Sequence, residues 1–275
     1  MNKLLLSGIY IYPIKSLGGV SLAESYIEER GLQYDRRWVL IDDEGMFITQ
    51  RKYPLLSLLQ VDVLDNQLKI SHKDHPLETI SFSIDQQTRV GIPVTIWDDL
   101  TEGFEVDPNV SEWFSRYMNF SVRLVKMNQA TKRHVDPRYA SHKEIVSFAD
   151  GYPCLIIGQS SLDHLNEKLN EPVHMDRFRP NFVFTGGEAH VEDTFKDFEM
   201  GGIQFSAVKP CARCVLITVN QQTAAKSAEP LKTLSKYRTI NNKIMFGQNL
   251  LHQGSGIIRV GMEIQIKSTK EKILP

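Results

Sequence analysis

The stretch Asp35-Arg-Arg-Trp-Val-Leu-Ile-Asp-Asp-Glu-Gly-Met-Phe-Ile-Thr-Gln-Arg-Lys52, DRRWVLIDDEGMFITQRK, contains two short apolar runs separated by an acidic turn with a glycine. Arg37–Asp42 and Met46–Thr49 have the β-branched and aromatic content that is typical of strands, and Asp43-Glu44-Gly45 is a turn signal between them. The sequence therefore predicts a β-hairpin. Basic residues stand at both of its ends, so we expect their side chains to converge on one rim.

Short strand-like segments continue through the first hundred residues. Outside the hairpin they are predicted at Ile9–Ile14, Leu56–Leu64, Gln67–His72, Thr79–Ile84 and Arg89–Trp97. Regular short strands with little helix are typical of a β-barrel or a sandwich. A helix is predicted next, over residues 108–117, because its apolar side chains fall on one helical face, and a strand follows at Val122–Met127.

The polar segment 128–143 has no periodicity and predicts a loop or a domain boundary. Beyond it, helices are predicted near residues 160–169 and 230–237, and strands at Cys154–Gly158, Asn181–Thr185, Ile203–Val208, Cys214–Val219, Ile257–Val260 and Glu263–Lys267. We therefore expect a mixed, β-rich α+β fold. Its first domain, residues 1–127, would be β-barrel-like, and its second, residues 128–275, a β-barrel with a few helices.

The composition excludes several classes of protein. The 275 residues include 32 Lys and Arg against 33 Asp and Glu, so no basic field exists to attract nucleic acid, and any anion must bind in a local pocket. No run of about 18 apolar residues predicts a membrane span. The opening apolar run alternates and ends at Pro13, as a first strand does, rather than as a signal peptide. Three cysteines are a poor disulfide framework, which favours a reducing cytoplasm.

Two of the three cysteines lie in the stretch Lys209–Asn220, KPCARCVLITVN, where Arg213 separates Cys211 from Cys214. A structural zinc site needs four nitrogen or sulfur ligands, and no second pair has the required spacing. A thioredoxin-like dithiol needs a helix, whereas the run after Cys214 predicts a strand. Two packed cysteines and a soft-metal ligand remain open. Arg213 favours the second, because a guanidinium stabilises a thiolate and can bind an anion.

Other polar side chains stand at the predicted ends of strands, where they could bind an anion. Lys15 and Ser16 follow the first strand beside two glycines, Arg36 precedes the hairpin, and Arg179 is expected to be held extended by the proline after it. Each has an alternative as a solvated or ion-paired side chain. Asp150 is either a turn former or a pocket carboxylate that handles protons.

These segments together resemble one family. KPCARCVLITVN resembles the cysteine motif of MOSC domains, named after the C-terminal domain of molybdenum cofactor sulfurase. YPIKSLGG, DRRWVLIDDEGMFITQR, FADGYP, FRPN and MFGQN occur in the chain in the order that resembles the paired MOSC N-terminal β-barrel and MOSC architecture. That architecture occurs in the mitochondrial amidoxime-reducing component and its bacterial relatives, and the resemblance runs from about Ile9 to Ile266.

The resemblance implies a molybdenum cofactor, Mo-molybdopterin, and a role for each matching residue. Cys214 would supply the thiolate that binds molybdenum, and Cys211 would have a packing or supporting role. Asp150 matches an acidic position near the metal and would be catalytic together with Cys214. The pterin and its phosphate would be bound by Lys15, Ser16, Arg36, Arg179, Asn181 and Arg213. Pyridoxal phosphate binding is a further expectation attached to the family.

The function that the resemblance implies is a cytoplasmic oxidoreductase that reduces N-hydroxylated compounds: amidoximes, hydroxylamines and N-hydroxylated bases. No flavin or nicotinamide fingerprint and no cluster of iron–sulfur cysteines is visible, so electrons are expected from a separate ferredoxin-, flavoprotein- or cytochrome-like protein. The expected partners include no nucleic acid and no membrane. The alternative is a carrier that holds sulfur or the molybdenum cofactor on Cys214 without turning over a substrate.

Overall fold

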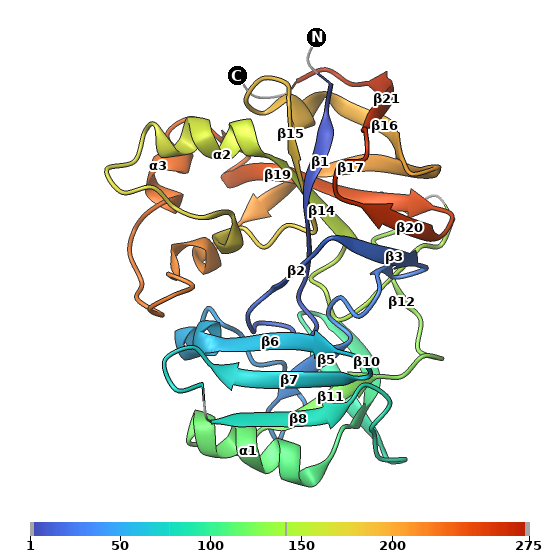
Figure 1. The fold of residues 1–275 in the computed structure, drawn as a ribbon, viewed down its shortest axis with the longest axis vertical. Helices are drawn as coiled ribbons and strands as arrows, with labels where there is room; N and C mark the ends of the chain where they lie inside the picture. The colour runs from blue at the N-terminus through green and yellow to red at the C-terminus, as the bar shows by residue number, and fades with distance from the viewer. Residues whose placement is uncertain (1–2, 77, 141, 273–275) are drawn as a thin grey trace.

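The computed structural model describes residues 3–76, 78–140 and 142–272 and confirms the β-rich α+β class (Figure 1). The helices in this part of the chain are α1 (Pro108–Met118), α2 (Gln159–Asn166) and α3 (Leu231–Ser235), with 3₁₀ helices η1 (Pro54–Leu58), η2 (Met175–Arg177), η3 (Val191–Thr194) and η4 (Val215–Thr218). Among the described residues, no helix combines the length and the apolar character that crossing a bilayer requires.

The largest sheet occupies the upper half of the molecule in Figure 1 and has the strand order β2-β1-β15-β14-β19-β17-β16-β21, with β18 also paired to β19. Its strands are β1 (Leu5–Ile11), β2 (Val20–Leu22), β14 (Cys154–Gly158), β15 (Phe182–Thr185), β16 (Phe195–Met200), β17 (Ile203–Arg213), β18 (Thr239–Ile240), β19 (Lys243–Gln253) and β21 (Gln265–Thr269). β14 and β15 run parallel, and their apolar residues are buried almost continuously, as expected for central strands.

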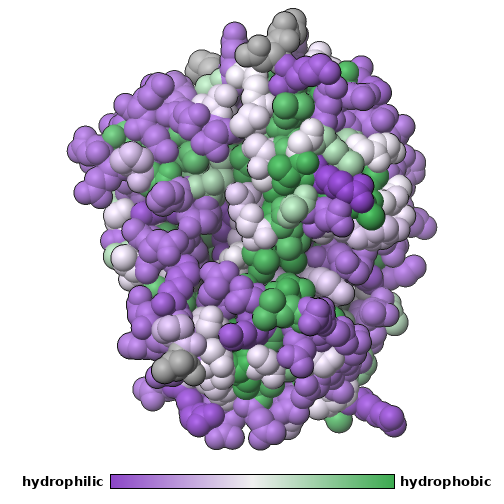
Figure 2. All heavy atoms as spheres, in the orientation of Figure 1, coloured by the Kyte–Doolittle hydropathy of each residue, from purple (hydrophilic) through white to green (hydrophobic). Residues whose placement is uncertain are grey.

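The beginning of the chain is part of this sheet. β1 pairs antiparallel with β15, with Ile9 opposite Phe182, although the other strands beyond β2 come from residues 154–269. In Figure 1 the blue β1 accordingly lies beside β15, and Figure 2 shows a narrow hydrophobic band down the middle of the same face. The division of the chain at residues 127 and 128 stays a prediction, and this pairing ties the first strand to the second half.

The lower half of the molecule contains two smaller sheets and α1. One sheet has the order β5-β11-β10-β9 and the other the order β6-β7-β8. Their strands are β5 (Trp38–Ile41), β6 (Leu59–Leu64), β7 (Gln67–His72), β8 (Thr79–Ser83), β9 (Gly91–Ile96), β10 (Asp99–Glu105) and β11 (Arg123–Met127). Asp107 caps α1 by accepting a hydrogen bond from the Asn109 amide at 2.8 Å. Phe114 of α1 and Trp38 of β5 belong to the core between these elements.

Short strands connect the two halves. β3 (Glu24–Glu28) pairs with β4 (Gly31–Leu32) and with β20 (Gly256–Arg259), so a strand from each end of the chain meets in one small sheet. β12 (Arg133–His134) pairs with β13 (Ile145–Val146) around the polar segment that was predicted to be a loop. That segment therefore contains one strand, although a short one.

The predicted hairpin at residues 35–52 forms only in part. Its first arm is β5, but residues 46–49 form no strand and pair through isolated bridges, Ile41 with Phe47 and Met46 with Thr95. The turn forms as predicted, because the Asp42 carboxylate accepts hydrogen bonds from the amides of Glu44 and Met46.

Nine of the described strands lie in segments where none was predicted: the short strands β2, β3, β4, β12, β13 and β18, and the longer strands β10, β16 and β19. β10 has mostly half-buried or exposed side chains, so its sequence carries little apolar pattern. In β19, Gly247 interrupts the apolar run and has a φ of +81°. The strand predicted at Cys214–Val219 is wrong. β17 ends at Arg213, and the β-branched residues that follow form η4, because Ile217 packs against Phe178 and Phe246 instead of pairing in the sheet.

Gly31 provides a test of how the halves fit together. It has a φ of +100°, and a Cβ atom there would lie 2.5 Å from the carbonyl oxygen of Pro153. Gly254 is the control, because it has a similar φ of +91° but no atom within 4 Å of such a Cβ. Its substitution therefore measures the cost of the backbone conformation without a steric clash. We expect Gly254→Ala to lower the free energy of unfolding by about 1 kcal/mol and Gly31→Ala by about 2–4 kcal/mol, measured by urea denaturation. Equal losses would show that the approach to Pro153 imposes no constraint.

Candidate functional site

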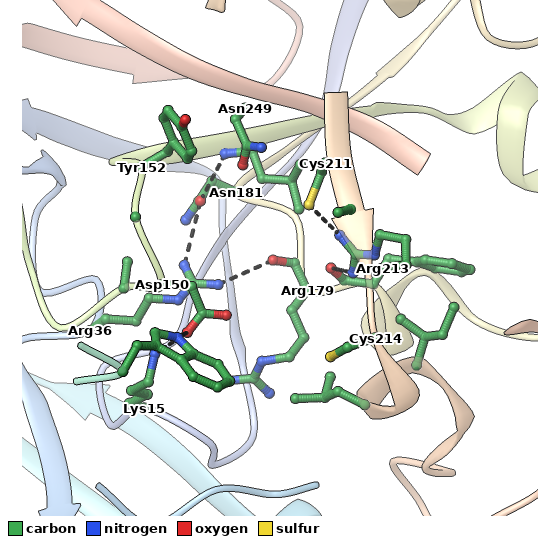
Figure 3. Close-up of a pocket in the computed structure, with 18 of the residues that line it drawn as sticks. Lys15, Arg36, Asp150, Tyr152, Arg179, Asn181, Cys211, Arg213, Cys214 and Asn249 are labelled. Carbon is green, nitrogen blue, oxygen red and sulfur yellow. Dashed lines mark hydrogen bonds and ion pairs between the residues drawn. The ribbon is translucent and has the colours of Figure 1, made fainter. Parts of the chain in front are cut away.

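All eight residues predicted for the site line one pocket between the two halves, with a volume of about 310 Å³. They are Lys15, Ser16, Arg36, Asp150, Arg179, Asn181, Arg213 and Cys214. Figure 3 shows Cys214 and Arg213 on one side, Lys15, Arg36 and Asp150 on the other, and Arg179 between them. Residues distant in sequence meet here because the pocket lies where β1, β14, β15 and β17 begin or end.

Backbone hydrogen bonds fix the turns that carry the basic residues from the first half of the chain. The Lys15 amide donates to the carbonyl of Trp38 at 2.8 Å, and the Arg36 amide donates to the carbonyl of Tyr12 at 3.0 Å. The Ser16 hydroxyl donates to the carbonyl of Ile48 at 3.1 Å. The turn after β1 is therefore attached to both ends of the 35–52 segment.

Three of these residues have left-handed backbone conformations. Ser16 has a φ of 75°, Arg36 of 52° and Arg179 of 54°. The extended conformation expected for Arg179 from the proline after it is therefore wrong: hydrogen bonds around the turn outweigh that local preference. Such conformations cost on the order of 1–2 kcal/mol each in residues other than glycine and cluster at binding sites. Among the described residues, twelve residues other than glycine have a positive φ, and four of them, these three and Trp97, line the pocket.

Tyr12 positions two of the arginines, and the sequence reasoning missed it. The guanidinium carbons of Arg36 and Arg179 lie 4.5 Å and 4.1 Å from the centroid of its ring. The Tyr12 hydroxyl donates to the carbonyl of Pro180 at 3.1 Å, and its amide donates to the carboxylate of buried Asp35 at 2.8 Å. The only signal in the sequence was an aromatic residue directly before the Pro13–Lys15 turn. An electron-rich ring stabilises cations that are removed from water.

The side chain of Asn181 connects β1, β14 and Arg36 through hydrogen bonds. Its side-chain oxygen accepts hydrogen bonds from the Leu155 amide at 3.1 Å and from Arg36 at 3.4 Å, and its side-chain nitrogen donates to the carbonyl of Tyr10 at 3.2 Å. The side chain is 1% exposed. These contacts give Asn181 a positioning role between β1, β14 and Arg36.

Positive charge exceeds negative charge in this group. Lys15, Arg36, Arg179 and Arg213 line the pocket, and the carboxylates paired with them are those of Asp35, which binds Arg36 at 2.5 Å, and Asp150, which binds Lys15 at 2.5 Å. Arg51 and Lys209 also line the pocket, so six cations stand against these two carboxylates.

Arg179 is the cation with the least compensation. Its Nη1 donates to the carbonyl of Leu17 at 2.7 Å, and no carboxylate pairs with it among the described residues. Burial lowers its pKa to about 10, an effect that the nearby Tyr12 hydroxyl opposes. A buried cation without a counterion is costly unless a ligand supplies the negative charge. The pocket therefore suits an anionic ligand.

Asp150 is held as a carboxylate. Its Oδ1 accepts hydrogen bonds from Lys15 Nζ at 2.5 Å and from Trp97 Nε1 at 3.1 Å. Burial would raise the pKa of Asp150, but Lys15 and Trp97 together hold it well below its usual range. The side chain keeps 73% of its surface open to the pocket, so the contacts with Lys15 and Trp97 outweigh desolvation. Burial lowers the pKa of Lys15, and Asp150 only partly offsets this. The pair therefore consists of a firmly ionised acceptor and a destabilised ammonium donor.

The two thiols of the 209–220 stretch have different surroundings. Arg213 donates from Nη1 to Cys211 Sγ at 3.0 Å and from Nη2 to the carbonyl of Phe178 at 2.5 Å, and Cys211 packs beside the cluster that contains Phe178. Cys214 is exposed and lines the pocket at the end of β17. The helix η4 that follows removes the strand on which the case against a dithiol rested. The structure instead shows that Cys211 Sγ accepts a hydrogen bond from Arg213, whereas the Cys214 thiol is exposed to the pocket.

The donor set fits a soft metal carried by an anionic cofactor. Cys214 offers a thiol sulfur, the ligand that soft metals prefer, within the same pocket as the excess cations. Arg213 Nε is buried and has no hydrogen-bond partner among the described residues. A buried donor in that state is normally satisfied by an ordered water or, at a binding site, by a ligand. The sulfur, the orphaned donor and the excess charge point to one ligand.

Asp150→Asn tests the coupling between Lys15 and Asp150. The carboxylate raises the pKa of Lys15 and burial lowers it, so removing the carboxylate should lower this pKa further. The titration of Lys15, followed by ¹³C NMR of labelled lysine, should then move to lower pH. Glu24→Gln, which removes the partner of Arg259 in an exposed ion pair, is the control and should leave Lys15 unchanged. A titration of Lys15 that moves upward or stays in place would refute the coupling.

Comparison with known proteins finds one family model in each half of the chain. A family model described as the MOSC N-terminal beta barrel domain matches residues 3–121, and one described as the MOSC domain matches residues 143–265. The mitochondrial amidoxime-reducing component 1 of Mus musculus is 31% identical over 280 residues, covering 92% of this chain and 79% of the relative. The mitochondrial amidoxime reducing component 2 of Rattus norvegicus is 31% identical over 276 residues, covering 93% and 81%.

A second kind of relative is a longer protein. The molybdenum cofactor sulfurase of Arabidopsis thaliana is 28% identical over 269 residues, which cover 90% of this chain and 33% of the sulfurase. The chain thus resembles about a third of that protein. Both kinds of relative are named for chemistry that concerns N-hydroxylated compounds or the molybdenum cofactor.

Proposed function

Because the chain belongs to the family of proteins that join a MOSC N-terminal β-barrel domain to a MOSC domain, we propose that it is a molybdenum-cofactor-dependent oxidoreductase. Its substrates would be N-hydroxylated compounds such as amidoximes, hydroxylamines and N-hydroxylated bases, reduced with electrons from a separate redox protein. The observation that supports this most is the meeting of an open thiol, Cys214, with uncompensated cations in one pocket.

The pocket residues divide into ligands and supports in this proposal. Cys214 would supply the thiolate to molybdenum, and Arg179, Arg213 and Lys15 would bind the pterin and its phosphate. Ser16 and Asn181 act mainly through the turns that they hold, because their side chains already bind backbone groups. Arg36, paired with Asp35 and lying over Tyr12, adds charge to the same wall. The cofactor, when bound, supplies the two-electron reduction of an N–O bond.

Asp150 and Lys15 would handle protons as a pair. Asp150 alone is a poor acid, because its carboxylate stays ionised at neutral pH. Lys15 holds a proton at Nζ, 2.5 Å from that carboxylate, and burial weakens its hold on the proton. The reduction uses two electrons from the donor protein and two protons. Lys15 would donate one proton from Nζ to the leaving oxygen, which departs as water, and solvent would supply the second proton to the nitrogen. Asp150 would orient the ammonium and accept a hydrogen bond from an N–H of the substrate.

The electron donor of this proposal is a ferredoxin-, flavoprotein- or cytochrome-like protein. The compartment is a reducing cytoplasm, because the three cysteines are free thiols and Cys214 has to remain one. Pyridoxal phosphate is left out of the proposal, since the observations above concern a soft metal and an anion and none concerns an aldehyde cofactor.

Two cysteine variants test the proposal. Purified wild-type protein should contain molybdenum and reduce benzamidoxime with an artificial electron donor. Cys214→Ala should reduce activity to background, because the metal loses its protein ligand. Cys211→Ala, the matched control in the same stretch, should lose less than about tenfold, since this sulfur only supports Arg213. If Cys211→Ala abolished activity and Cys214→Ala did not, the ligand assignment would be wrong.

A carrier is the second candidate function, favoured by the likeness to the molybdenum cofactor sulfurase. A carrier would bind the cofactor, or hold sulfur on Cys214, and would not reduce a substrate. The same preparations separate the two functions. Stoichiometric molybdenum without reduction of any N-hydroxylated compound, whatever the donor, would favour the carrier.

A further inference from the structure

Trp97 occupies an unusual position at the rim of the pocket. It begins the two-residue turn between β9 and β10, with a φ of 58°, and 41% of its surface is exposed. Turn positions with positive φ normally carry glycine, asparagine or aspartate, and a bulky side chain there is strained. The residue nevertheless lines the pocket. A strained, exposed tryptophan at a pocket rim indicates a use for its ring.

The contacts of Trp97 fix the ring while leaving it accessible. Its Nε1 donates to Asp150 Oδ1 at 3.1 Å, and its ring packs edge-on to Phe47 with centroids 5.2 Å apart. The guanidinium carbon of Arg51 lies 4.1 Å from the centroid of the indole ring. The indole is thus anchored through its Nε1, and the guanidinium of Arg51 lies over its ring.

The guanidinium of Arg51 is readily displaced. Among the described residues it makes no hydrogen bond and no ion pair, and only the backbone carbonyl of Arg51 accepts a hydrogen bond, from Lys226 at 2.7 Å. Its contact with the indole is therefore an exposed cation–π interaction, the weak kind. A guanidinium is a planar group of one carbon and three nitrogens, over which its positive charge is delocalised. It shows which chemical shape this face accepts.

We propose that the face of Trp97 binds the planar, delocalised N–C–N group of amidoxime-type substrates, and that Arg51 occupies this face until the substrate displaces it. The inference rests on the proposed function and adds the residue that selects among N-hydroxylated compounds. An amidoxime or amidine group has the flat geometry of the guanidinium. Stacked on Trp97, it lies beside the Asp150 carboxylate, which accepts an N–H from it.

Selectivity follows from shape. A flat conjugated group gains contact with the whole indole face, whereas a hydroxylamine on a saturated carbon is tetrahedral and cannot stack. Trp97 therefore favours amidoximes and N-hydroxylated bases over aliphatic hydroxylamines. Arg51 acts as an internal competitor for the same face.

Binding of benzamidine to the holoprotein tests the recognition step without turnover. Titration calorimetry should show Arg51→Ala binding benzamidine roughly two- to fivefold more tightly than wild type, because the competitor is gone. Trp97→Leu should bind it roughly three- to tenfold more weakly. Lys52→Ala removes the neighbouring cation, which lies over Tyr53, and should leave the affinity unchanged. Weaker binding by Arg51→Ala, or loss of molybdenum and pterin from it, would overturn the inference by making Arg51 a ligand of substrate or cofactor.

The ratio of kcat/KM for benzamidoxime to that for cyclohexylhydroxylamine tests the selectivity. Trp97→Leu should lower this ratio roughly three- to tenfold. Trp97→Phe, which keeps a ring and loses the bond to Asp150, should retain most of the preference. An unchanged ratio in Trp97→Leu, with molybdenum content equal to wild type, refutes the role of Trp97 and leaves the proposed function standing. A wild-type protein that reduces neither compound refutes the proposed function. In that case the binding of benzamidine still tests whether the face of Trp97 binds a planar N–C–N group.

Discussion

The pairing of β1 with β15 is the constraint on which the site depends. Ile9 lies opposite Phe182, and the Tyr10 amide donates to the carbonyl of Asn181 at 2.8 Å, so the turn after β1 meets the turn before β15. Lys15 and Arg179 come from these two turns, and β17 ends in the same place. Without this register the cations would lie on separate halves of the molecule, and neither half would hold an anion.

The second organising feature is an imbalance of charge that the protein maintains without a bound ligand. Tyr12 and Asp35 hold two guanidiniums in place, while Arg179 lacks a carboxylate among the described residues and the Nε of Arg213 lacks a partner. Such an arrangement costs stability, and natural sequences retain that cost mainly at functional sites. The left-handed turns at Ser16, Arg36 and Arg179 add to it. Strain and charge thus mark the same pocket.

The sequence predicted the fold class, the strands β1, β14 and β15, the first part of β17 and eight of the residues that line the pocket, because their apolar runs and the ordered motifs are local. It failed where tertiary packing overrides local preference. The run after Cys214 has strand-forming residues, but burial of Ile217 turns it into η4. β10 was missed because exposed side chains dominate it. Tyr12 and Trp97 matter because arginine side chains lie over their rings. These contacts join residues far apart in the sequence, so no pattern along the chain predicts them.

The place of β1 in the large sheet also affects how the protein is made. Ile9 leaves the ribosome roughly 170 residues before its partner Phe182, and at about 5–20 residues per second this delay lasts on the order of ten seconds or more. During that time β1 can pair only with β2 in the large sheet, and its other edge has no partner. The candidate pocket is therefore completed late in synthesis. A nascent chain would need protection of this segment from aggregation until the second half has emerged.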